Sequence, residues 1–240
     1  MLPPETERVW TFLKDQPTLE GFVLVGGTAI ALQIHHRRSE NLDFVYPRVR
    51  LPRAHLEALR LLSAQAGFDF SPEDDESAVE ELADSSLDLH DFQQDYLVNR
   101  TVMVSFFTPD PAMIKILGKD SASGPRVASL PELFKTKCLV SALRSKTRDW
   151  LDLYLLLHDH GFSIRDFAAA FREAGVESQC SIALARLCNG RPQTDDEGFS
   201  HLLPNPPSLE QMRQFFIAQR DLLEAESAAD AARNRKGELP

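Results

Sequence analysis

Short apolar runs bounded by turn residues recur along the first half of the chain. Runs of this length, flanked by Gly, Pro, Asn or Asp, are typical of buried strands. The predicted strands cover residues 22–25, 42–45, 68–70, 96–98 and 101–107. Asn99 and Arg100 lie between the last two, so we expect these strands to form a hairpin.

Apolar residues at helical spacing predict helices on both sides of these strands. Residues 5–14 carry one apolar stripe, and residues 53–66 carry another in which Leu56, Leu59 and Leu62 should face inward. A short helix should also follow the first strand. The first half therefore predicts a mixed arrangement of strands and helices over residues 1–118.

Beyond residue 126 the pattern is helical throughout. Ser163 and Asp166 have the spacing of a capping box, and Ser208 and Gln211 open a last helix that we expect to run to about Ala229. Residues 119–126, which contain Ser, Gly and Pro, are the predicted linker. The sequence thus predicts a helical domain over residues 127–240.

The junction of the first strand and the following helix suits phosphate chemistry. The apolar run ends in Gly26-Gly27-Thr28, and the next strand carries a carboxylate at Asp43. Glycines let backbone N–H groups approach an anion, and a helix N-terminus favours negative charge. A carboxylate nearby can hold a divalent cation that phosphates share.

Charge and composition narrow the classes of function. The formal net charge of −10 argues against indiscriminate binding of nucleic acid, although basic residues cluster at 37–53 and 135–148. Such clusters suit a nucleoside triphosphate or a small part of an RNA, but charge alone favours the reading as ordinary solvated faces. The acidic stretch 73–91 is expected to be exposed surface. We expect no membrane span, because no apolar run is long enough. We expect a cytoplasmic protein, because the three cysteines are odd in number and widely separated, which suggests reduced thiols.

A second motif lies within the predicted helical hairpin at 130–157. Lys137 and Arg144 are placed to share one helix face, and Asp149 and Asp152 to share another. Arg148 is spaced to pair with Asp152. A hairpin stabilised by salt bridges would explain the motif without any function.

Together the two motifs resemble the AbiEii/AbiGii group of nucleotidyltransferase toxins, a branch of the polymerase-β-like nucleotidyltransferases. That group reads G-G-T-A-x-A-L, then H-R-x-S, then D-x-D-F, and later K-x-x-A-[IL]-x-x-R and [KR]-D-[WYF]-x-D-[IL]-Y. The first pattern matches residues 26–32, the second 36–39, and the later ones 137–154, while residues 102–107 are similar to the family's core strand. In the third pattern Asn41 stands where the family has its first Asp, and Asp43 matches the second.

The resemblance implies an α+β fold, with a small mixed-sheet nucleotidyltransferase core and a C-terminal helical bundle. It also implies a toxin of a toxin–antitoxin or phage-abortive system. Such an enzyme would transfer a nucleotide from a nucleoside triphosphate to RNA or protein with Mg²⁺ or Mn²⁺, and an antitoxin protein would be its partner.

The resemblance and the charges also assign roles, and we expect the assigned residues to share one cleft. The expected catalytic residues are Asp43, Lys137, Asp149 and Asp152, and the expected metal ligands are Asp43 and Asn41. The expected nucleotide-binding residues are Gly26, Gly27, Thr28, Arg38, Ser39, Arg144 and Arg148.

Two alternatives from other classes stay open. Asn41 brings no charge to a metal and cannot act as a base, so the chain is alternatively a nucleotide-binding protein with impaired catalysis. A regulatory protein that uses the acidic stretch 73–91 is a third reading.

His158-Asp159-His160 resembles a metal triplet, but its place before Gly161 favours a helix C-terminus instead.

Overall fold

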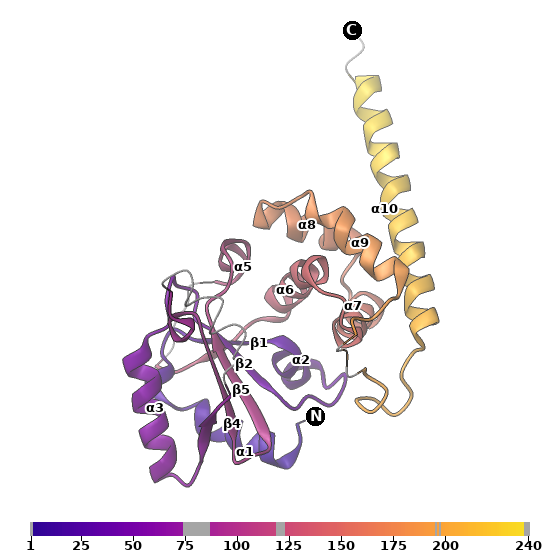
Figure 1. Ribbon diagram of the computed structural model, residues 1–240. Coiled ribbons are helices and arrows are strands. Elements are labelled where there is room, and N and C mark those ends of the chain that lie inside the picture. Colours follow the sequence, from indigo (N-terminus) through magenta and orange to yellow (C-terminus); the bar gives the residue numbers. More distant parts are fainter. Residues whose placement is uncertain (1, 74–86, 119–122, 195, 197, 238–240) are drawn as a thin grey trace. The chain divides into compact units, whose positions relative to one another are not determined.

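The computed structural model describes residues 2–73, 87–118, 123–194, 196 and 198–237, and it divides into two compact units, Met1–Leu133 and Phe134–Pro240 (Figure 1). Residues 74–86 of the acidic stretch and 119–122 of the predicted linker lie outside the described residues. The units divide at residues 133 and 134, later than the sequence suggests, because residues 126 and 127 pair with the sheet of the first unit. That each unit is a functional domain stays a prediction.

The first unit is built on a six-stranded mixed sheet in the order β3-β4-β5-β2-β1-β6. The strands are β1 (Val23–Val25), β2 (Leu42–Val45), β3 (Phe70–Pro72), β4 (Gln93–Val98), β5 (Val102–Phe107) and β6 (Arg126–Val127). β2 runs antiparallel to β1 and parallel to β5, and β4 and β5 form the predicted hairpin. Asn99 and Arg100 both have positive φ, which is the backbone of a tight hairpin turn.

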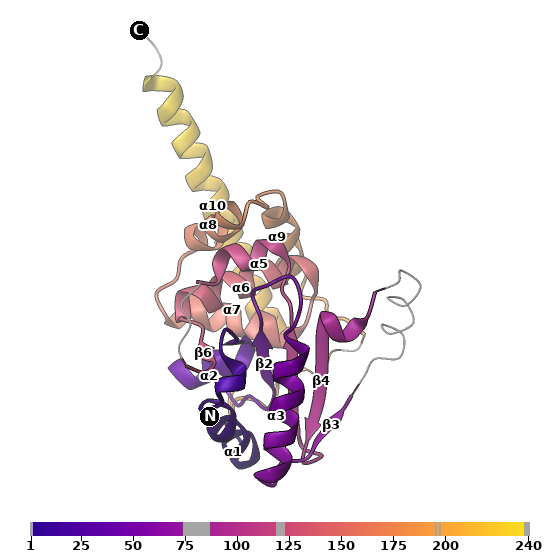
Figure 2. The same cartoon turned by 90° about the vertical axis from the view of Figure 1, so that its left-hand side faces the viewer.

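Four helices of the first unit surround this sheet in the described residues: α1 (Pro4–Leu13), α2 (Gly26–Ile34), α3 (Arg53–Gln65) and α5 (Pro111–Ile116). α2 packs against β1 and β2, and α3 packs near β3, as Figure 2 shows. The core between them is aromatic, since Phe44 stacks on Phe106 with ring centroids 5.3 Å apart and Phe22 meets the same ring edge-on at 5.5 Å. This core fixes the strands that carry the glycine motif and Asp43.

Two predictions for this unit were wrong in detail. Leu62 of α3 is 41% exposed, and the buried position on that turn belongs to Ser63, whose hydroxyl donates to the Leu59 carbonyl at 2.8 Å. A serine can face a core when its hydroxyl bonds within its own helix. The third strand begins at Phe70 rather than Phe68, because the pairing with β4 joins Phe70 to Val98.

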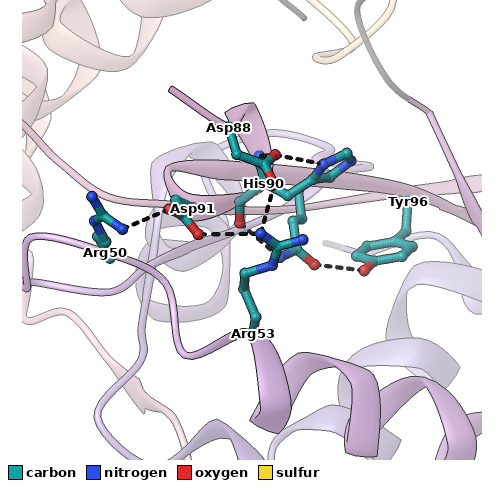
Figure 3. Close-up of polar contacts among 7 residues, drawn as sticks. Arg50, Arg53, Asp88, His90, Asp91 and Tyr96 are labelled. Atoms are coloured by element: carbon teal, nitrogen blue, oxygen red, sulfur yellow. Dashed lines mark hydrogen bonds and ion pairs between the residues drawn. The ribbon is translucent and has the colours of Figure 1, made fainter. Parts of the chain in front are cut away.

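A charged cluster holds the segment before α3 against residues 88–91 (Figure 3). Nη1 of Arg50 lies 2.9 Å from Asp91, and Nη1 of Arg53 lies 2.6 Å from Asp88. The hydrogen bond that Arg53 donates to the Asp88 carboxylate raises the pKa of Arg53 above its usual value. Both arginines follow the end of β2 that is farther from Asp43, so the basic residues clustered in sequence do not all gather at the glycine motif.

The second unit is helical, as predicted. α6 (Leu130–Leu143) starts in the first unit, and α7 (Thr147–Asp159), α8 (Ile164–Ala174), α9 (Gln179–Asn189) and α10 (Leu209–Gly237) follow. The predicted capping box of α8 is present, with Ser163 and Asp166 bonded reciprocally. α10 continues to Gly237, beyond the predicted Ala229, and its C-terminal part extends past α8 and α9 in Figure 1. Arg165 supports that part through an ion pair to Glu226 at 2.7 Å.

Candidate functional site

The glycine motif forms the junction between β1 and α2, and its geometry requires glycine at position 26. Gly26 has φ +72°, a conformation that residues with a side chain rarely adopt. A Cβ built on Gly26 would lie only 2.5 Å from Oδ2 of Asp43. The missing side chain therefore lets the Asp43 carboxylate approach the start of α2, where the first N–H groups of a helix have no partner within the helix.

Gly27 makes room for a buried arginine. A Cβ built on Gly27 would collide with Nη2 of Arg37 and would lie 3.2 Å from Oγ of Ser39. Arg37 is buried and donates from Nη1 to the Arg38 carbonyl at 2.8 Å. A guanidinium thus packs directly against the first turn of α2, next to the carboxylate-bearing strand.

Arg37 is the site residue that the sequence analysis missed. We assigned Arg38 to nucleotide binding, but its side chain is 56% exposed and pairs with Glu40 at 3.0 Å. The signal was available, because Arg37 is the residue that occupies the arginine position of the H-R-x-S pattern. The role of Arg38 stays a prediction.

Thr28 and Ser39 are buried and contact each other. Their hydroxyl oxygens are 2.8 Å apart, and the Thr28 hydroxyl also bonds to the backbone carbonyl of Asn41. These contacts fasten α2 to the segment that leads into β2, and so they hold Gly26 and Asp43 in register. These internal hydrogen bonds are enough to explain why both hydroxyls are present. Their contact with a nucleotide stays a prediction.

Asp43 belongs to a polar row that crosses the sheet. It is half-buried and lies in register with Val25 of β1 and Ser105 of β5, and Ser105 is in turn paired with Asp95 of β4. Oδ1 of Asp95 is buried and has no hydrogen-bond partner among the described residues. The alternating burial of β4 places Asp95 on the same sheet face as Asp43, a relation that only the strand register reveals.

Oxygen donors at positions 41 and 43 fit a hard divalent cation in part. Asn41 is exposed and lies two residues before Asp43, directly before the start of β2. No group of three or more His, Cys, Asp or Glu residues able to hold a metal occurs in the described part of the chain. Mg²⁺ is commonly bound by only one or two carboxylates together with substrate phosphates. The donor set therefore fits a cation that arrives with a nucleotide better than a permanently bound one.

The second motif forms a buried ion cluster inside the helical unit. Nζ of Lys137 lies 2.6 Å from Oδ1 of Asp149 and 2.7 Å from Oδ2 of Asp152. Nε of Arg144 lies 2.8 Å from Oδ2 of Asp149. The side chains of Lys137, Asp149 and Asp152 are all at most 8% exposed.

The hairpin geometry explains why these charges meet. α6 and α7 are joined by residues 144–146, so the last turns of α6 face the first turns of α7. Burial by itself would raise the pKa of Asp149, but Lys137 and Arg144 outweigh it and lower that pKa below its usual value. Asp149 is consequently ionised at neutral pH, and Lys137 is shared between two carboxylates.

The contacts of α7 bear on two smaller predictions. Asp152 is fully buried and pairs with Lys137 at 2.7 Å, while its pairing with Arg148 stays a prediction. His158 bonds to Asp159 at 2.6 Å at the exposed end of α7, as the helix C-terminus reading expects. A nucleotide contact of Arg148, and a common cleft for the two motifs, stay predictions.

Comparisons with known proteins found one matching family model and several similar solved structures. A family model described as nucleotidyl transferase AbiEii toxin, type IV toxin–antitoxin system, matches residues 10–235. Two crystal structures from Helicobacter pylori are similar: JHP933, at 18% identity and a TM-score of 0.51, covering 98% of this chain and 100% of that one, and a putative nucleotidyltransferase, at 19% and 0.50, covering 92% and 94%. MenT4, a nucleotidyltransferase toxin from Mycobacterium tuberculosis, matches at 15% identity and 0.49, covering 81% and 74%.

The two Helicobacter pylori structures support the fold, and the family model covers nearly the whole chain. A search of the curated proteins found no match. No helix in the described ranges is long and apolar enough to cross a membrane. Since the family model spans both motifs and both units, the chain belongs to the AbiEii family of nucleotidyltransferase toxins of type IV toxin–antitoxin systems.

Proposed function

We propose that this protein transfers a nucleotidyl group from a nucleoside triphosphate to an acceptor hydroxyl on RNA or protein. The observation that carries the proposal is the close approach of the Asp43 carboxylate to the side-chain-free start of α2. Anion-binding amides, a buried guanidinium and a metal-ligating carboxylate then lie within one short stretch of the first unit.

In this proposal the triphosphate binds at the start of α2. The N–H groups of Gly26 and Gly27 and the guanidinium of Arg37 would face its negative oxygens, and Asp43 with Asn41 would hold the cation that accompanies it. A bound Mg²⁺ or Mn²⁺ would supply charge neutralisation at the phosphates. The acceptor oxygen attacks the α-phosphorus, the bond to the β-phosphate breaks, and pyrophosphate leaves while the acceptor proton passes to water.

The buried cluster of α6 and α7 is assigned to the same reaction. Two cations and two carboxylates balance in charge, so the cluster does not act as a simple positive patch. Asp149 and Asp152 fix the position of the Lys137 amine, and Arg144 is the more exposed cation, with a side chain 48% exposed. Catalysis of phosphoryl transfer depends mainly on such positioning and charge stabilisation.

Asn41 favours a second candidate function, nucleotide binding without efficient transfer. Asp43 is the one carboxylate on β2, so a cation at this place receives less charge than two aspartates would give it. In this candidate the protein would act by holding a nucleotide or by binding its partner antitoxin.

One experiment separates the two candidates. Purified protein is incubated with each labelled nucleoside triphosphate, Mg²⁺ or Mn²⁺, and total cell RNA and protein. Label that becomes covalently attached to a macromolecule in wild type and not in Asp43→Ala supports transfer. Saturable nucleotide binding without attached label supports the binding protein. The absence of both nucleotide binding and attached label would refute both candidates.

A further inference from the structure

We propose that Gln193 and Asp196 are positioning residues that hold the turn between α6 and α7, and through it the Arg144–Asp149 ion pair. The two residues follow α9 and lie far along the chain from the turn that they bind. The inference rests on the proposed function only in that this ion pair is assigned to the reaction. It gives a role to a part of the tail that carries no recognisable motif.

The contacts reach the turn from both sides. Gln193 and Ser145 are bonded twice, the Ser145 N–H donating to the Gln193 side chain at 3.2 Å and the Gln193 N–H donating to the Ser145 carbonyl at 3.1 Å. The Thr147 N–H donates to Oδ2 of Asp196 at 2.8 Å. Arg186 of α9 donates to the carbonyl of Leu143, the last residue of α6, at 3.0 Å. Both helix ends that border the turn are therefore held.

Asp196 supplies a cap that the local sequence lacks. Lys146 occupies the N-cap position of α7 and makes no side-chain capping bond. A helix start without such a cap leaves N–H groups unsatisfied, and a carboxylate is the favoured partner there. Asp196 is itself braced, because its N–H donates to the Gln193 carbonyl at 3.1 Å and its Oδ1 accepts from the Gly198 N–H at 3.2 Å.

The turn matters because it carries one member of the ion pair and precedes the other. Arg144 lies just after the end of α6, so the backbone of the turn decides where its side chain points. Asp149 lies in the first turn of α7. If the turn loosens, the half-exposed Arg144 is free to leave Asp149 for solvent, and the buried carboxylate then depends on Lys137 alone.

The test compares Asp196→Ala with Asp196→Asn and with Asp166→Ala. Asparagine keeps an oxygen for the Thr147 N–H and is itself a good capping residue, so Asp196→Asn should behave as wild type. Asp166 belongs to the capping box of α8 in the same unit and, in the described part of the chain, forms no hydrogen bond or ion pair with the turn. Asp166→Ala is therefore a control matched in chemistry and in expected loss of stability. Thermal melting of all three variants verifies that they are folded.

The decisive readout is the NMR signal of the Arg144 Nε–H, which reports its bond to Asp149 and needs no catalysis. In Asp196→Ala this signal should move to the position of a solvated guanidinium, and the Thr147 amide should exchange roughly fivefold faster, the factor expected for one lost cap. In Asp196→Asn and Asp166→Ala both should stay as in wild type. An unchanged Arg144 signal in Asp196→Ala would overturn the proposal.

Measuring transfer separates this proposal from the proposed function. If the protein is active, kcat should fall severalfold in Asp196→Ala, recover in Asp196→Asn, and stay unchanged in Asp166→Ala. If the Arg144 signal moves as expected and no variant, wild type included, transfers nucleotide, the positioning role stands and the proposed reaction fails. An equal fall of kcat in Asp196→Ala and Asp166→Ala would show a general loss of stability and would overturn the specific role.

Discussion

Replacing Glu132 with Gln should destabilise the protein far more than an ordinary loss of one surface charge. Glu132 lies in the first turn of α6 and accepts hydrogen bonds from Arg126, from the Gly118 N–H at 2.6 Å and from the Ser129 N–H at 2.7 Å. Its carboxylate thereby joins the residues on both sides of segment 119–125 to the helix that carries Lys137. A glutamine offers only one acceptor oxygen and turns its NH₂ group toward donors.

The magnitude follows from the pKa of Glu132. Burial would raise this pKa, but the bonds from Arg126, Gly118 and Ser129 outweigh burial and lower it from 4.5 to about 2. The side chain is 17% exposed, so little of this effect is lost to solvent screening. A shift of that size corresponds to about 3 kcal/mol of folding free energy at neutral pH. Because the folded-state pKa is lowered, this stabilisation is complete above about pH 4.5 and is lost as the pH falls toward 2.

The assay is urea denaturation of wild type and Glu132→Gln between pH 2 and pH 8. The difference in unfolding free energy should be about 3 kcal/mol at pH 7 and should shrink steadily below pH 4.5, where wild type loses its advantage. Glu57→Gln is the control in the same unit, since Glu57 and Arg60 form an exposed pair whose loss should cost far less than the loss of Glu132. A difference in unfolding free energy that does not change with pH, or an equal loss in both variants, would refute the conclusion that the Glu132 carboxylate stabilises the fold by its charge.

Three further predictions concern the glycine motif and β2. Gly26→Ala should lower stability by about 1–3 kcal/mol because of its positive φ, and it should also weaken nucleotide binding. Gly67 has a similar φ and open space around it, so Gly67→Ala should lower stability without affecting nucleotide binding. Equal nucleotide affinity in the two variants would contradict the role of the close approach between Gly26 and Asp43. Asp43→Ala should abolish transfer without unfolding the protein, as measured by label incorporation and circular dichroism. Asn41→Asp should gain more thermal stabilisation from Mg²⁺ with nucleotide than wild type does, because a second carboxylate repels Asp43 until a cation binds; an equal gain would place position 41 away from the metal.

Local sequence patterns predicted much of the fold. The capping box at Ser163 and the hairpin at Asn99 appear where their chemistry predicts them, because each depends on a few neighbouring residues. Element ends that depend on distant partners were less predictable. β3 begins where β4 offers a partner, and Ser63 rather than Leu62 is buried because the core lies on that side of α3.

The candidate site was likewise predictable only where neighbouring residues determine it. Gly26 and Asp43 are adjacent in space because β1 and β2 pair, and the sequence from the glycine motif to Asp43 was enough to suggest this. Arg37 was missed although the H-R-x-S pattern marks its position, and the structure shows that it is the arginine beside Gly27. Asp95 was not found, since it joins Asp43 only through the register of β5. Register is set by the whole sheet, so no local pattern reports it.

The burial of Lys137 between two carboxylates bears most directly on function. Taking charges out of water is costly, and well-packed apolar residues of the same volume often give equal or greater stability than a buried ion pair. Stability alone therefore does not explain Lys137, Asp149 and Asp152, although removing Lys137 would take one cation away from two buried carboxylates and cost roughly 3–5 kcal/mol. What the cluster provides instead is a lysine amine held in one fixed position. Phosphoryl transfer uses such a fixed amine, and a helical hairpin by itself does not need one. An apolar triple replacement that folds as stably as wild type while losing nucleotide transfer would bear this out, and full activity in such a variant would refute it.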